Sequence, residues 1–494
     1  MHFVPTMGGL HQGHAQLMVH ARRLQQAPCS VLASVYVNPL QFGAGEDFER
    51  YPRTFDADCA VAEHAGADAL WCPTDQQIYP QGADQVFRLR VPPSLQGPLC
   101  GAGRPGHFDG VATVVSRLLA LVRPAVLVLG EKDWQQLTIV RALVSELALP
   151  VRVCGCPTVR DADGLASSSR NRYLSDRERQ RVLVLPRVLQ EAADAVRRSG
   201  DSIDLAALSR SMEREGLAVE YVEVVNPSDL QPAPEDQACR LLAAAVRCGT
   251  TRLIDHIALM TRSPIVAIDG PAGAGKSTVT RAVAERLGLL YLDTGAMYRA
   301  VTWWVLEQGL DPDDVAAVEP ALEGLVVELD PLVEGVQAVR VNGTDVTEVI
   351  RDPRVTARVS AVAAHGCVRA LLTAQQQRLG TRGGLVAEGR DIGTAVFPDA
   401  DVKVFLTATP AERARRRAQD LERRGFDVPS LAELEAQIAQ RDQLDSSREV
   451  APLVQAEDAT ELITDGMGIE AVIDALVDLF RAKIPADAWP GVNA

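Results

Sequence analysis

The chain has 494 residues and a formal net charge of −15 at pH 7, with 47% hydrophobic and 23% charged residues. This length predicts more than one domain, because a single hydrophobic core stops growing at about 250–300 residues. The negative charge disfavours non-specific nucleic-acid binding, which depends on a basic surface, so no nucleic-acid partner is expected.

The sequence shows no N-terminal signal pattern and no apolar run of about 18 residues, so we expect a cytoplasmic protein without a membrane partner. Its nine cysteines are an odd number without a CxxC pair, which favours reduced thiols over a disulfide framework. Cys154 and Cys156 form a CxC that could suggest a metal site. Alternation along a strand explains this spacing more simply, since zinc would need further ligands.

The segment PTMGGLHQGH at residues 5–14 is a glycine-rich turn followed by two histidines. On a helix starting near Leu10, His11 and His14 would share one face and point back over the helix N-terminus. Free N–H groups at that end suit a phosphate, and Gly13 would let a nucleotide approach the backbone. The pattern predicts a nucleotidyl-transfer site; the alternative interpretation is a pair of core histidines.

Short apolar runs at 30–37 and 125–130 lie between helical patterns, which indicates a parallel sheet with crossover helices. The sequence SDRE from Ser175 is a capping box that opens a helical stretch. The runs at 219–227 and 239–259 then predict strands of a small α+β unit.

A second α/β pattern follows a short polar junction at 260–264. The buried strand IVAIDG leads into GPAGAGKS at 270–277, which fits G-x-x-x-x-G-K-[ST] in the strand–loop–helix context that this motif requires. Further strand-like runs separated by helical ones are found at 289–295, 385–391, 402–408 and 460–465. The loop predicts ATP binding by Gly270, Gly273, Gly275, Lys276, Ser277 and Thr278, with Lys276 on the β/γ-phosphates and the Ser277 hydroxyl on Mg²⁺.

Four motifs after this loop point to its acceptor: DTGAMYR (293–299), EGRDIGT (388–394), ERARRRAQDLERR (412–424) and RDQLDSSR (441–448). With the loop, they resemble the bacterial cytidylate kinase family over residues 265–484. The resemblance implies phosphorylation of CMP or dCMP by ATP. It assigns the acceptor phosphate to Thr294, Arg299, Arg390 and Arg448, the cytosine edge to Ser360, Arg369 and Asp391, and the ribose to Arg441 and Asp445. Arginine forks suit phosphate and mixed donors and acceptors suit a base, although the arginines could instead form surface ion pairs.

Six arginines lie between 413 and 424, directly after TPAE, which predicts a capping box with proline at the first helical position. The resemblance makes this region, about 410–426, a lid that closes over the phosphates. Arg417 is our candidate for the ATP contact. The stretch from about 311 to 370 corresponds to the nucleotide-monophosphate domain of the bacterial enzymes.

The N-terminal half contains VNPLQF (37–42), YPRTFDAD (51–58), GRPGHFDGV (103–111), GEKDWQQL (130–137) and DGLASSSRN (163–171). With PTMGGLHQGH, these segments closely resemble pantothenate synthetase, also called pantoate–β-alanine ligase, over about residues 1–262. The resemblance implies condensation of pantoate with β-alanine through pantoyl adenylate, with AMP and diphosphate released from ATP. A tRNA synthetase would also carry a KMSKS-type loop and an anticodon-binding region, and neither is evident.

Lys132 and Gln136 are four residues apart, which predicts one helical face where Lys132 neutralises a triphosphate and Gln136 binds a small polar acid. By the resemblance, Gln41 and Gln136 hold pantoate, Gln41 also contributes to the β-alanine site, and His14 is the proton donor. The implied ATP site comprises Met7, Gly8, Gly9, Leu10, His11, Gln12, Gly13, His14, Gly130, Glu131, Lys132, Asp133, Val159, Ser167, Ser168, Ser169 and Arg170. The last three of these would clamp the phosphates as a mobile lid.

We therefore expect a bifunctional α/β enzyme with a Rossmann-like adenylate-forming domain (1–158), a small α+β lid subdomain (159–262) and a P-loop kinase domain (263–494). Mg²⁺ is expected with ATP, and the resemblance implies a homodimer through the N-terminal half. The alternative is a working kinase joined to a truncated, non-catalytic binding or dimerisation module.

The start of the chain departs from the ligase family, whose members usually have a helix and a complete strand ahead of the PTMG turn. Only MHFV precedes it here. Either the native start lies upstream or the fold tolerates the loss of these elements. We favour the first hypothesis and expect the first strand of the sheet to be incomplete.

Overall fold

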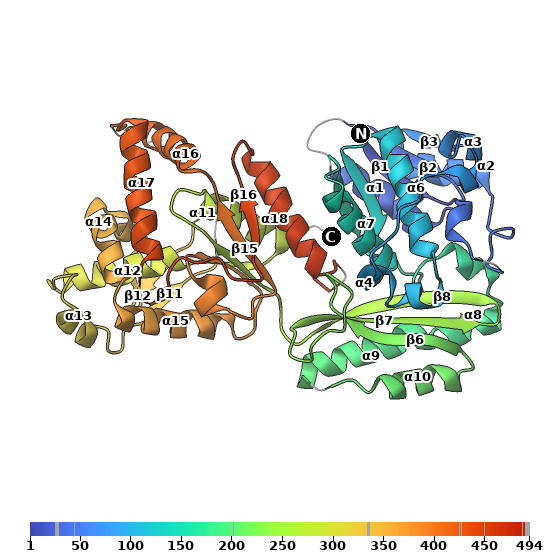
Figure 1. Cartoon of the computed structure of the whole chain (residues 1–494). Coiled ribbons are helices and arrows are strands. Elements are labelled where there is room, and N and C mark those ends of the chain that lie inside the picture. The colour runs from blue at the N-terminus through green and yellow to red at the C-terminus, as the bar shows by residue number, and fades with distance from the viewer. Residues whose placement is uncertain are drawn as a thin grey trace. The chain divides into compact units, whose positions relative to one another are not determined.

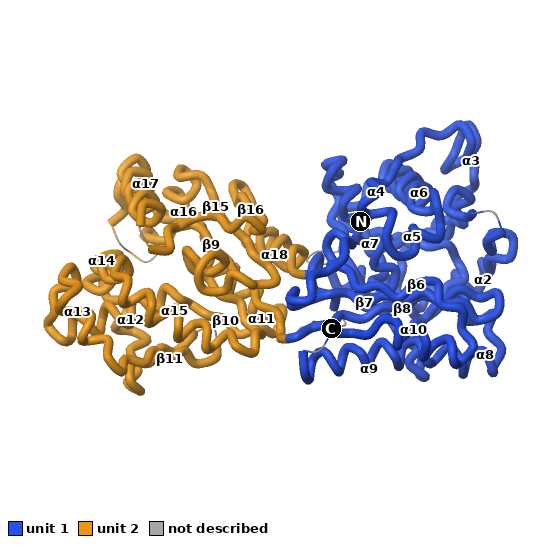
Figure 2. The backbone as a smooth tube through the Cα atoms, turned by 60° about the horizontal axis from the view of Figure 1, so that its bottom comes forward, with its two compact units in different colours: residues 1–261, 481–489 blue, residues 262–480, 490–494 orange. Residues whose placement is uncertain are grey.

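The computed structural model describes residues 1–24, 29–43, 45–200, 202–332, 336–423, 425, 427–448, 450–486 and 488–489. The described chain forms two compact units, residues 1–261 with 481–489 and residues 262–480 (Figures 1 and 2). Parts of the expected kinase domain lie outside the described residues, namely 333–335 of the insert, Arg424 and Phe426 of the lid, and residues 449, 487 and 490–494.

The first unit contains a five-stranded parallel sheet in the order β3-β2-β1-β4-β5, a strand order of doubly wound nucleotide-binding folds. Its strands are β1 (His2–Thr6), β2 (Val31–Val35), β3 (Ala69–Trp71), β4 (Val126–Gly130) and β5 (Arg152–Cys156). The expectation of an incomplete first strand is wrong, because β1 is the middle strand and pairs with β2 along its whole length, from His2↔Val31 to Thr6↔Val35. Even the few residues before the glycines suffice to form it.

Helices cover both faces of this sheet. Neighbouring residues of a strand point to opposite faces, so each strand contributes side chains to two cores. Phe3 and Leu127 belong to a core with α6 (His107–Val122) and α7 (Trp134–Glu146). Val4 and Val128 belong to a second core with α1 (Gln12–Arg23) and α2 (Phe55–His64). Cys154 and Cys156 both lie in that second core, so strand alternation accounts for their spacing.

The rest of the first unit is a three-stranded antiparallel sheet with helices, as the sequence predicted (Figure 1). Its strands are β6 (Ala218–Val225), β7 (Cys239–Cys248) and β8 (Thr251–Met260), and its helices are α8 (Asp176–Val182), α9 (Val184–Ser199) and α10 (Leu205–Arg214). The capping box at Ser175 is confirmed, because Ser175 and Glu178 bond each other's backbone N–H groups. Three short helices complete the unit: α3 (Asp75–Ile78), α4 (Pro93–Gln96) and α5 (Cys100–Gly103).

The second unit is also built on a five-stranded parallel sheet, in the order β10-β14-β9-β15-β16. Its strands are β9 (Ile265–Asp269), β10 (Leu290–Asp293), β14 (Leu385–Gly389), β15 (Val402–Thr407) and β16 (Thr460–Ile463). Its main helices are α11 (Lys276–Leu287), α12 (Thr294–Glu307), α15 (Gly366–Gly380) and α18 (Ile469–Lys483). Because β9 is central, the loop that follows it opens at the carboxyl edge of the sheet, where ligands of such folds bind.

Two further regions belong to this unit, and neither adds a strand to the five-stranded sheet. The insert contains α13 (Val315–Ala321), α14 (Pro353–Val362) and a small antiparallel sheet of β11 (Val327–Leu329), β12 (Val339–Val341) and β13 (Thr344–Asp345). The arginine-rich region forms α16 (Pro410–Arg423), followed by α17 (Leu431–Ser446). Among the described residues, no single helix is long and apolar enough to cross a membrane; one bent pair, α14 with α15, meets the length and composition criteria together, at an angle of 99°.

The expected capping box at TPAE is only half formed. Thr409 Oγ1 accepts the Glu412 N–H at 3.3 Å, as predicted. The Glu412 carboxylate, however, bonds Arg415 and Arg416, while the Thr409 N–H donates to Asp465. Two arginines on the next helical turn compete for the carboxylate, so the reciprocal bond is replaced.

Candidate active sites

The PTMGG turn of the first unit is held by Asp58, which the sequence did not single out. The N–H groups of Gly9 and Leu10 donate to its carboxylate at 3.1 and 2.8 Å, and the side chain is buried. Gly8 has φ +86°, and a Cβ there would lie 2.8 Å from Val35 Cγ1. These amides therefore bind a protein carboxylate, not the nucleotide as expected.

A sequence signal for Asp58 did exist. Asp58, Ala62 and Ala65 are buried and are spaced i, i+4 and i+7, so Asp58 shares a helical face with the two alanines. A carboxylate on the apolar stripe of an amphipathic helix needs a buried partner. Only the fold reveals that this partner is the turn almost 50 residues earlier.

His11 and His14 form a capping pair at the start of α1. His11 is the N-cap, with extended backbone at φ −141°, so the helix begins at Gln12 and not near Leu10. The Gly13 N–H donates to His11 Nδ1 at 3.1 Å, the His11 N–H lies 3.4 Å from His14 Nδ1, and the ring centroids are 4.1 Å apart. The imidazoles thus occupy N–H groups that we expected to bind phosphate.

This arrangement fixes the protonation of both rings. An Nδ1 that accepts a hydrogen bond leaves the proton of a neutral imidazole on Nε2. Burial lowers the pKa of His11 to about 4, with Lys132 adding to the effect, and burial with His11 nearby lowers the pKa of His14 to about 3. At neutral pH, both rings therefore present an uncharged Nε2–H donor.

Gly13 makes room for the His11 ring. A Cβ at this position would lie 2.8 Å from His11 Cε1 and 3.0 Å from Nδ1. The structural reason for this glycine is therefore a neighbouring imidazole, where the sequence suggested approach of a nucleotide.

Most of the expected ligase residues line one cavity beside the histidines. Those that line it are Met7, His11, Gly13, His14, Gln41, Gly130, Lys132, Asp133, Gln136, Val159, Ser167, Ser168, Ser169 and Arg170. The five others, Gly8, Gly9, Leu10, Gln12 and Glu131, do not line it. The Glu131 side chain is buried beside Gly155, and its Oε2 accepts the Ala486 N–H at 2.9 Å.

Lys132 and Gln136 both border this cavity, although they do not share a helix. Lys132 lies in a 3₁₀ turn at Glu131–Asp133, and Gln136 lies in the first turn of α7. Lys132 Nζ is 3.4 Å from the Asp133 carboxylate. The i, i+4 argument was wrong about the helix, yet the tight turn still directs both side chains to the same space.

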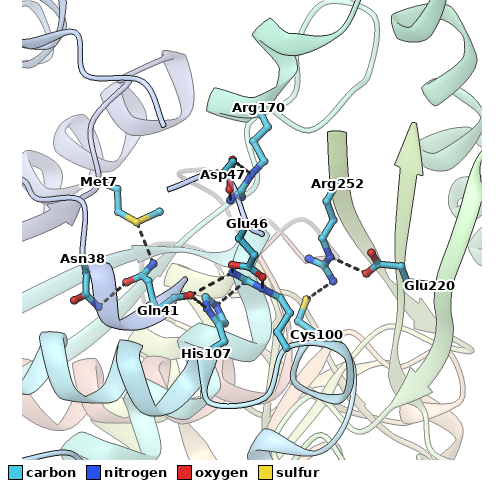
Figure 3. A network of polar contacts seen from close by, with 11 residues as sticks. Met7, Asn38, Gln41, Glu46, Asp47, Cys100, His107, Arg170, Glu220 and Arg252 are labelled. Atoms are coloured by element: carbon cyan, nitrogen blue, oxygen red, sulfur yellow. Dashed lines mark hydrogen bonds and ion pairs between the residues drawn. The ribbon is translucent and has the colours of Figure 1, made fainter. Parts of the chain in front are cut away.

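Gln41 is oriented by Asn38, a second residue that the sequence analysis missed (Figure 3). Its Oε1 accepts from Asn38 Nδ2 at 3.1 Å, and its Nε2 donates to Met7 Sδ at 3.0 Å. Asn38 itself is buried and also bonds Gly110 O and the Tyr79 hydroxyl. The i, i+3 spacing of Asn38 and Gln41 around a 3₁₀ turn brings the two amides together.

Arg170, which lines the same cavity, is paired with a carboxylate (Figure 3). Arg170 makes a bidentate pair with Asp47, with both N···O distances at 2.9 Å, so its guanidinium already has a carboxylate partner. Ser169 Oγ is 3.2 Å from the Tyr51 hydroxyl. A phosphate bound by Arg170 would therefore replace the Asp47 carboxylate or share the Arg170 guanidinium with it.

The phosphate loop of the second unit has two kinds of glycine. Gly273 and Gly275 adopt φ +78° and +88° and line a cleft. Gly270 does not line it, and a Cβ there would lie 2.0 Å from Leu406 O, so this glycine permits close packing on β15. Lys276 Nζ donates to the Gly270 and Pro271 carbonyls at 2.7 and 2.8 Å, and burial lowers its pKa.

All the remaining expected kinase residues line this cleft. They are Gly273, Gly275, Lys276, Ser277, Thr278, Thr294, Arg299, Ser360, Arg369, Arg390, Asp391, Arg417, Arg441, Asp445 and Arg448. The cleft has a volume of about 710 Å³. This volume lies within the roughly 300–1,000 Å³ typical of a small-ligand pocket.

The acceptor arginines are paired across the cleft wall. Asp445, with a buried carboxylate, accepts from Arg390 Nε at 3.0 Å and from Arg448 Nη2. Arg369 and Asp391 form a buried ion pair, and Arg369 lies 5.5 Å from the Tyr298 ring centroid. These are ion pairs, as the alternative interpretation held, but they border a cleft instead of an open surface.

The lid arginines divide into two groups. Arg413 bonds Asp442 and Ala272 O, while Arg416 bonds Ala274 O and Thr464, so both attach the helix to the phosphate loop. Arg417 is half exposed and lies 3.6 Å from Asp420. It lines the cleft together with Arg415, Arg416 and Arg423, so its position alone does not distinguish it.

Taken together, these features define two nucleotide-binding enzyme sites, one of an adenylate-forming type and one of a P-loop kinase type. The sequence matches the Pantoate-beta-alanine ligase family over residues 1–258 and the Cytidylate kinase family over residues 266–482. A protein of Synechococcus sp. (strain CC9311) named "Bifunctional pantoate ligase/cytidylate kinase" is 66% identical, over 99% of this chain and 99% of its own length. One of the same name from Synechococcus sp. (strain WH7803) is 67% identical over 98% and 99%.

Among solved structures, pantothenate synthetase from Thermus thermophilus is 45% identical and covers 52% of this chain and 92% of its own, with a TM-score of 0.48. The chain belongs to the family of bifunctional pantoate ligase/cytidylate kinases. It is therefore an enzyme with two activities, and the alternative of a non-catalytic N-terminal module is set aside.

Proposed function

We propose that the first unit joins pantoate to β-alanine in two steps. The pantoate carboxylate attacks the α-phosphorus of ATP, which gives pantoyl adenylate and diphosphate. The β-alanine amine then attacks the acyl carbon and displaces AMP. The observation that carries this proposal is the convergence of His11, His14, Lys132, Gln41 and Gln136 on one cavity.

The residue roles follow from their chemistry. Neutral Nε2–H groups of His11 and His14 would donate to the α-phosphate as it gains charge, with His14 in the proton-donor position, because fixed donors stabilise developing charge. Lys132 would neutralise the triphosphate. Gln41 and Gln136 would hold pantoate by amide hydrogen bonds, and Gln41 would also border the β-alanine site. The ATP phosphates would replace the Asp47 carboxylate as the partner of Arg170 and would lie beside Ser168 and Ser169.

For the second unit, we propose phosphoryl transfer from ATP to CMP or dCMP. The phosphate loop with Lys276 would bind the donor phosphates, and the arginines that Asp445 connects would bind the acceptor phosphate. Ser360, Arg369 and Asp391 would read the base, with Arg441 and Asp445 on the ribose. The lid arginines would add positive charge to the transferring group.

Mg²⁺ is proposed as the metal that accompanies ATP. In the kinase site, the Ser277 hydroxyl would offer an oxygen ligand suited to this hard cation, and the buried Glu388 carboxylate lines the same cleft. When bound, Mg²⁺ would neutralise charge on the ATP phosphates, while the residues named above would orient them.

We also propose that the chain is organised as domains 1–158, 159–262 and 263–494, and that it forms a homodimer through its N-terminal half. The two parallel sheets and the intervening antiparallel sheet support the domains. The dimer rests on family resemblance. Light scattering of the full chain and of residues 263–494 tests it, since only the full chain should be dimeric.

The decisive assay for the ligase is diphosphate release that requires both pantoate and ATP. His14→Ala should abolish this release and leave CMP phosphorylation unchanged. Diphosphate release by the unaltered chain that needs no pantoate would contradict the proposal.

A further inference from the structure

We propose that the Tyr291 hydroxyl is a positioning group of the kinase site. It holds the Glu388 carboxylate in place so that this carboxylate can accept a hydrogen bond from the Ser277 hydroxyl. That hydrogen bond would orient the Ser277 oxygen toward Mg²⁺. This inference rests on the proposed kinase function. Tyr291 lies outside the motifs that the sequence analysis used.

The two side chains meet between neighbouring strands. Tyr291 Oη donates to Glu388 Oε1 at 2.5 Å, and both residues are buried. Strands β10 and β14 are parallel, with Asp293 opposite Glu388. Since residues two apart on a strand share a face, Tyr291, Asp293 and Glu388 lie on the same side of the sheet.

The tyrosine ring is fixed from the helix side as well. Arg281 of α11 lies over it, with the guanidinium carbon 5.6 Å from the ring centroid. The same helix carries Ser277 in its first turn. Tyr291 therefore spans the space between the sheet that carries Glu388 and the helix that carries Ser277.

Burying the Tyr291 hydroxyl costs free energy of desolvation, and packing of the ring does not require this hydroxyl. Phenylalanine would fill the ring volume, whereas a buried hydroxyl must form a hydrogen bond to offset its desolvation. The bond that it forms is to Glu388. We therefore look to this carboxylate for the reason that a tyrosine occupies the position.

Glu388 lies among the residues of the expected phosphate site, because its side chain lines the same cleft as Lys276 and Ser277. Its second carboxylate oxygen, Oε2, is buried and has no hydrogen-bond partner among the described residues. A buried acceptor without a partner is costly, so this oxygen is available for a donor at the cleft.

A serine that gives a lone pair to a metal must direct its proton elsewhere. A carboxylate behind it is a strong acceptor, which orients the hydroxyl and makes its oxygen a better ligand. Tyr291 bonds Oε1 of Glu388, whereas Oε2 has no partner among the described residues and is therefore available to accept a hydrogen bond from Ser277. Removing the Tyr291 hydroxyl should loosen this arrangement without touching substrate or metal.

The test measures binding of a non-hydrolysable ATP analogue to the full chain by calorimetry, with and without Mg²⁺. In Tyr291→Phe, binding without Mg²⁺ should be unchanged, while the Mg²⁺ affinity of the complex should fall by about 10-fold, at the lower end of effects of removing a partner of a metal ligand. Mn²⁺ binding followed by electron paramagnetic resonance gives a second readout. Ligase activity of the same preparation reports an intact chain.

Glu388→Gln provides the matched comparison, because it keeps the side-chain volume and removes the charge. It should weaken Mg²⁺ binding at least as much as Tyr291→Phe, and the double variant should be no weaker than Glu388→Gln alone, since Tyr291 acts through Glu388. Wild-type Mg²⁺ affinity in Tyr291→Phe, additive losses in the double variant, or equal losses with and without Mg²⁺ would each overturn the inference. If the unaltered chain binds the analogue without any Mg²⁺ dependence, the proposed kinase function itself fails.

Discussion

Replacing Gly13 by alanine should damage the ligase without unfolding it. The new methyl would start 2.8 Å from His11 Cε1, whereas carbon atoms normally approach to about 3.5–4 Å. The His11 ring must therefore move by about 1 Å, which also breaks its hydrogen bond with the Gly13 N–H.

The expected magnitude combines two effects of opposite sign on stability. Losing a helix cap costs about 1 kcal/mol, and alanine instead of glycine in a helix gains about 1 kcal/mol. The free energy of unfolding should thus change little. A displacement of about 1 Å in a catalytic constellation, however, costs on the order of 100-fold in rate.

The assay is pantoate- and ATP-dependent diphosphate release, with CMP phosphorylation measured on the same sample. Ligase kcat/KM should fall by about 100-fold while kinase activity and melting temperature stay at wild-type values. Wild-type ligase kcat/KM in Gly13→Ala would refute the reasoning, because it would show that the position of the His11 ring does not matter.

Three further predictions follow from the same geometry. Asp58→Ala should lower the free energy of unfolding by about 3 kcal/mol, since buried amides lose a charged acceptor, and should reduce ligase activity; denaturant unfolding of the ligase unit without such a loss would contradict this. Asp445→Asn should raise the KM for CMP more than that for ATP, because Arg390 and Arg448 lose their common anchor, and an effect on ATP alone would speak against it. Stability should fall as the pH drops from 6.5 to about 4, because the unfolded chain takes up protons there that His11 and His14 exclude; His14→Gln should flatten this dependence, as measured by chemical denaturation.

Much of the fold could be predicted because its signals are local. Buried runs such as IVAIDG and the alternation of strands with helices indicate parallel sheets, and the Ser175 capping box forms from residues three apart. The phosphate loop was recognisable because one short segment contains the glycines, the lysine and the serine in order.

The remaining features depend on partners that are distant in the sequence. Asp58 holds a turn almost 50 residues away, and Glu131 faces Ala486 although its neighbours Gly130 and Lys132 line the cavity. Spacing rules also assume a helix that already exists. His11 caps its helix and Lys132 precedes its own, so both pairs meet by routes that an i, i+3 or i, i+4 rule does not describe.

The central claim is that one chain contains two separate active sites, and two single variants test it directly. Both activities would be measured on His14→Ala and on Lys276→Ala, each in the full chain. We predict that His14→Ala loses ligation and keeps CMP phosphorylation, and that Lys276→Ala does the reverse. Loss of both activities in either variant, or of neither, would contradict the account.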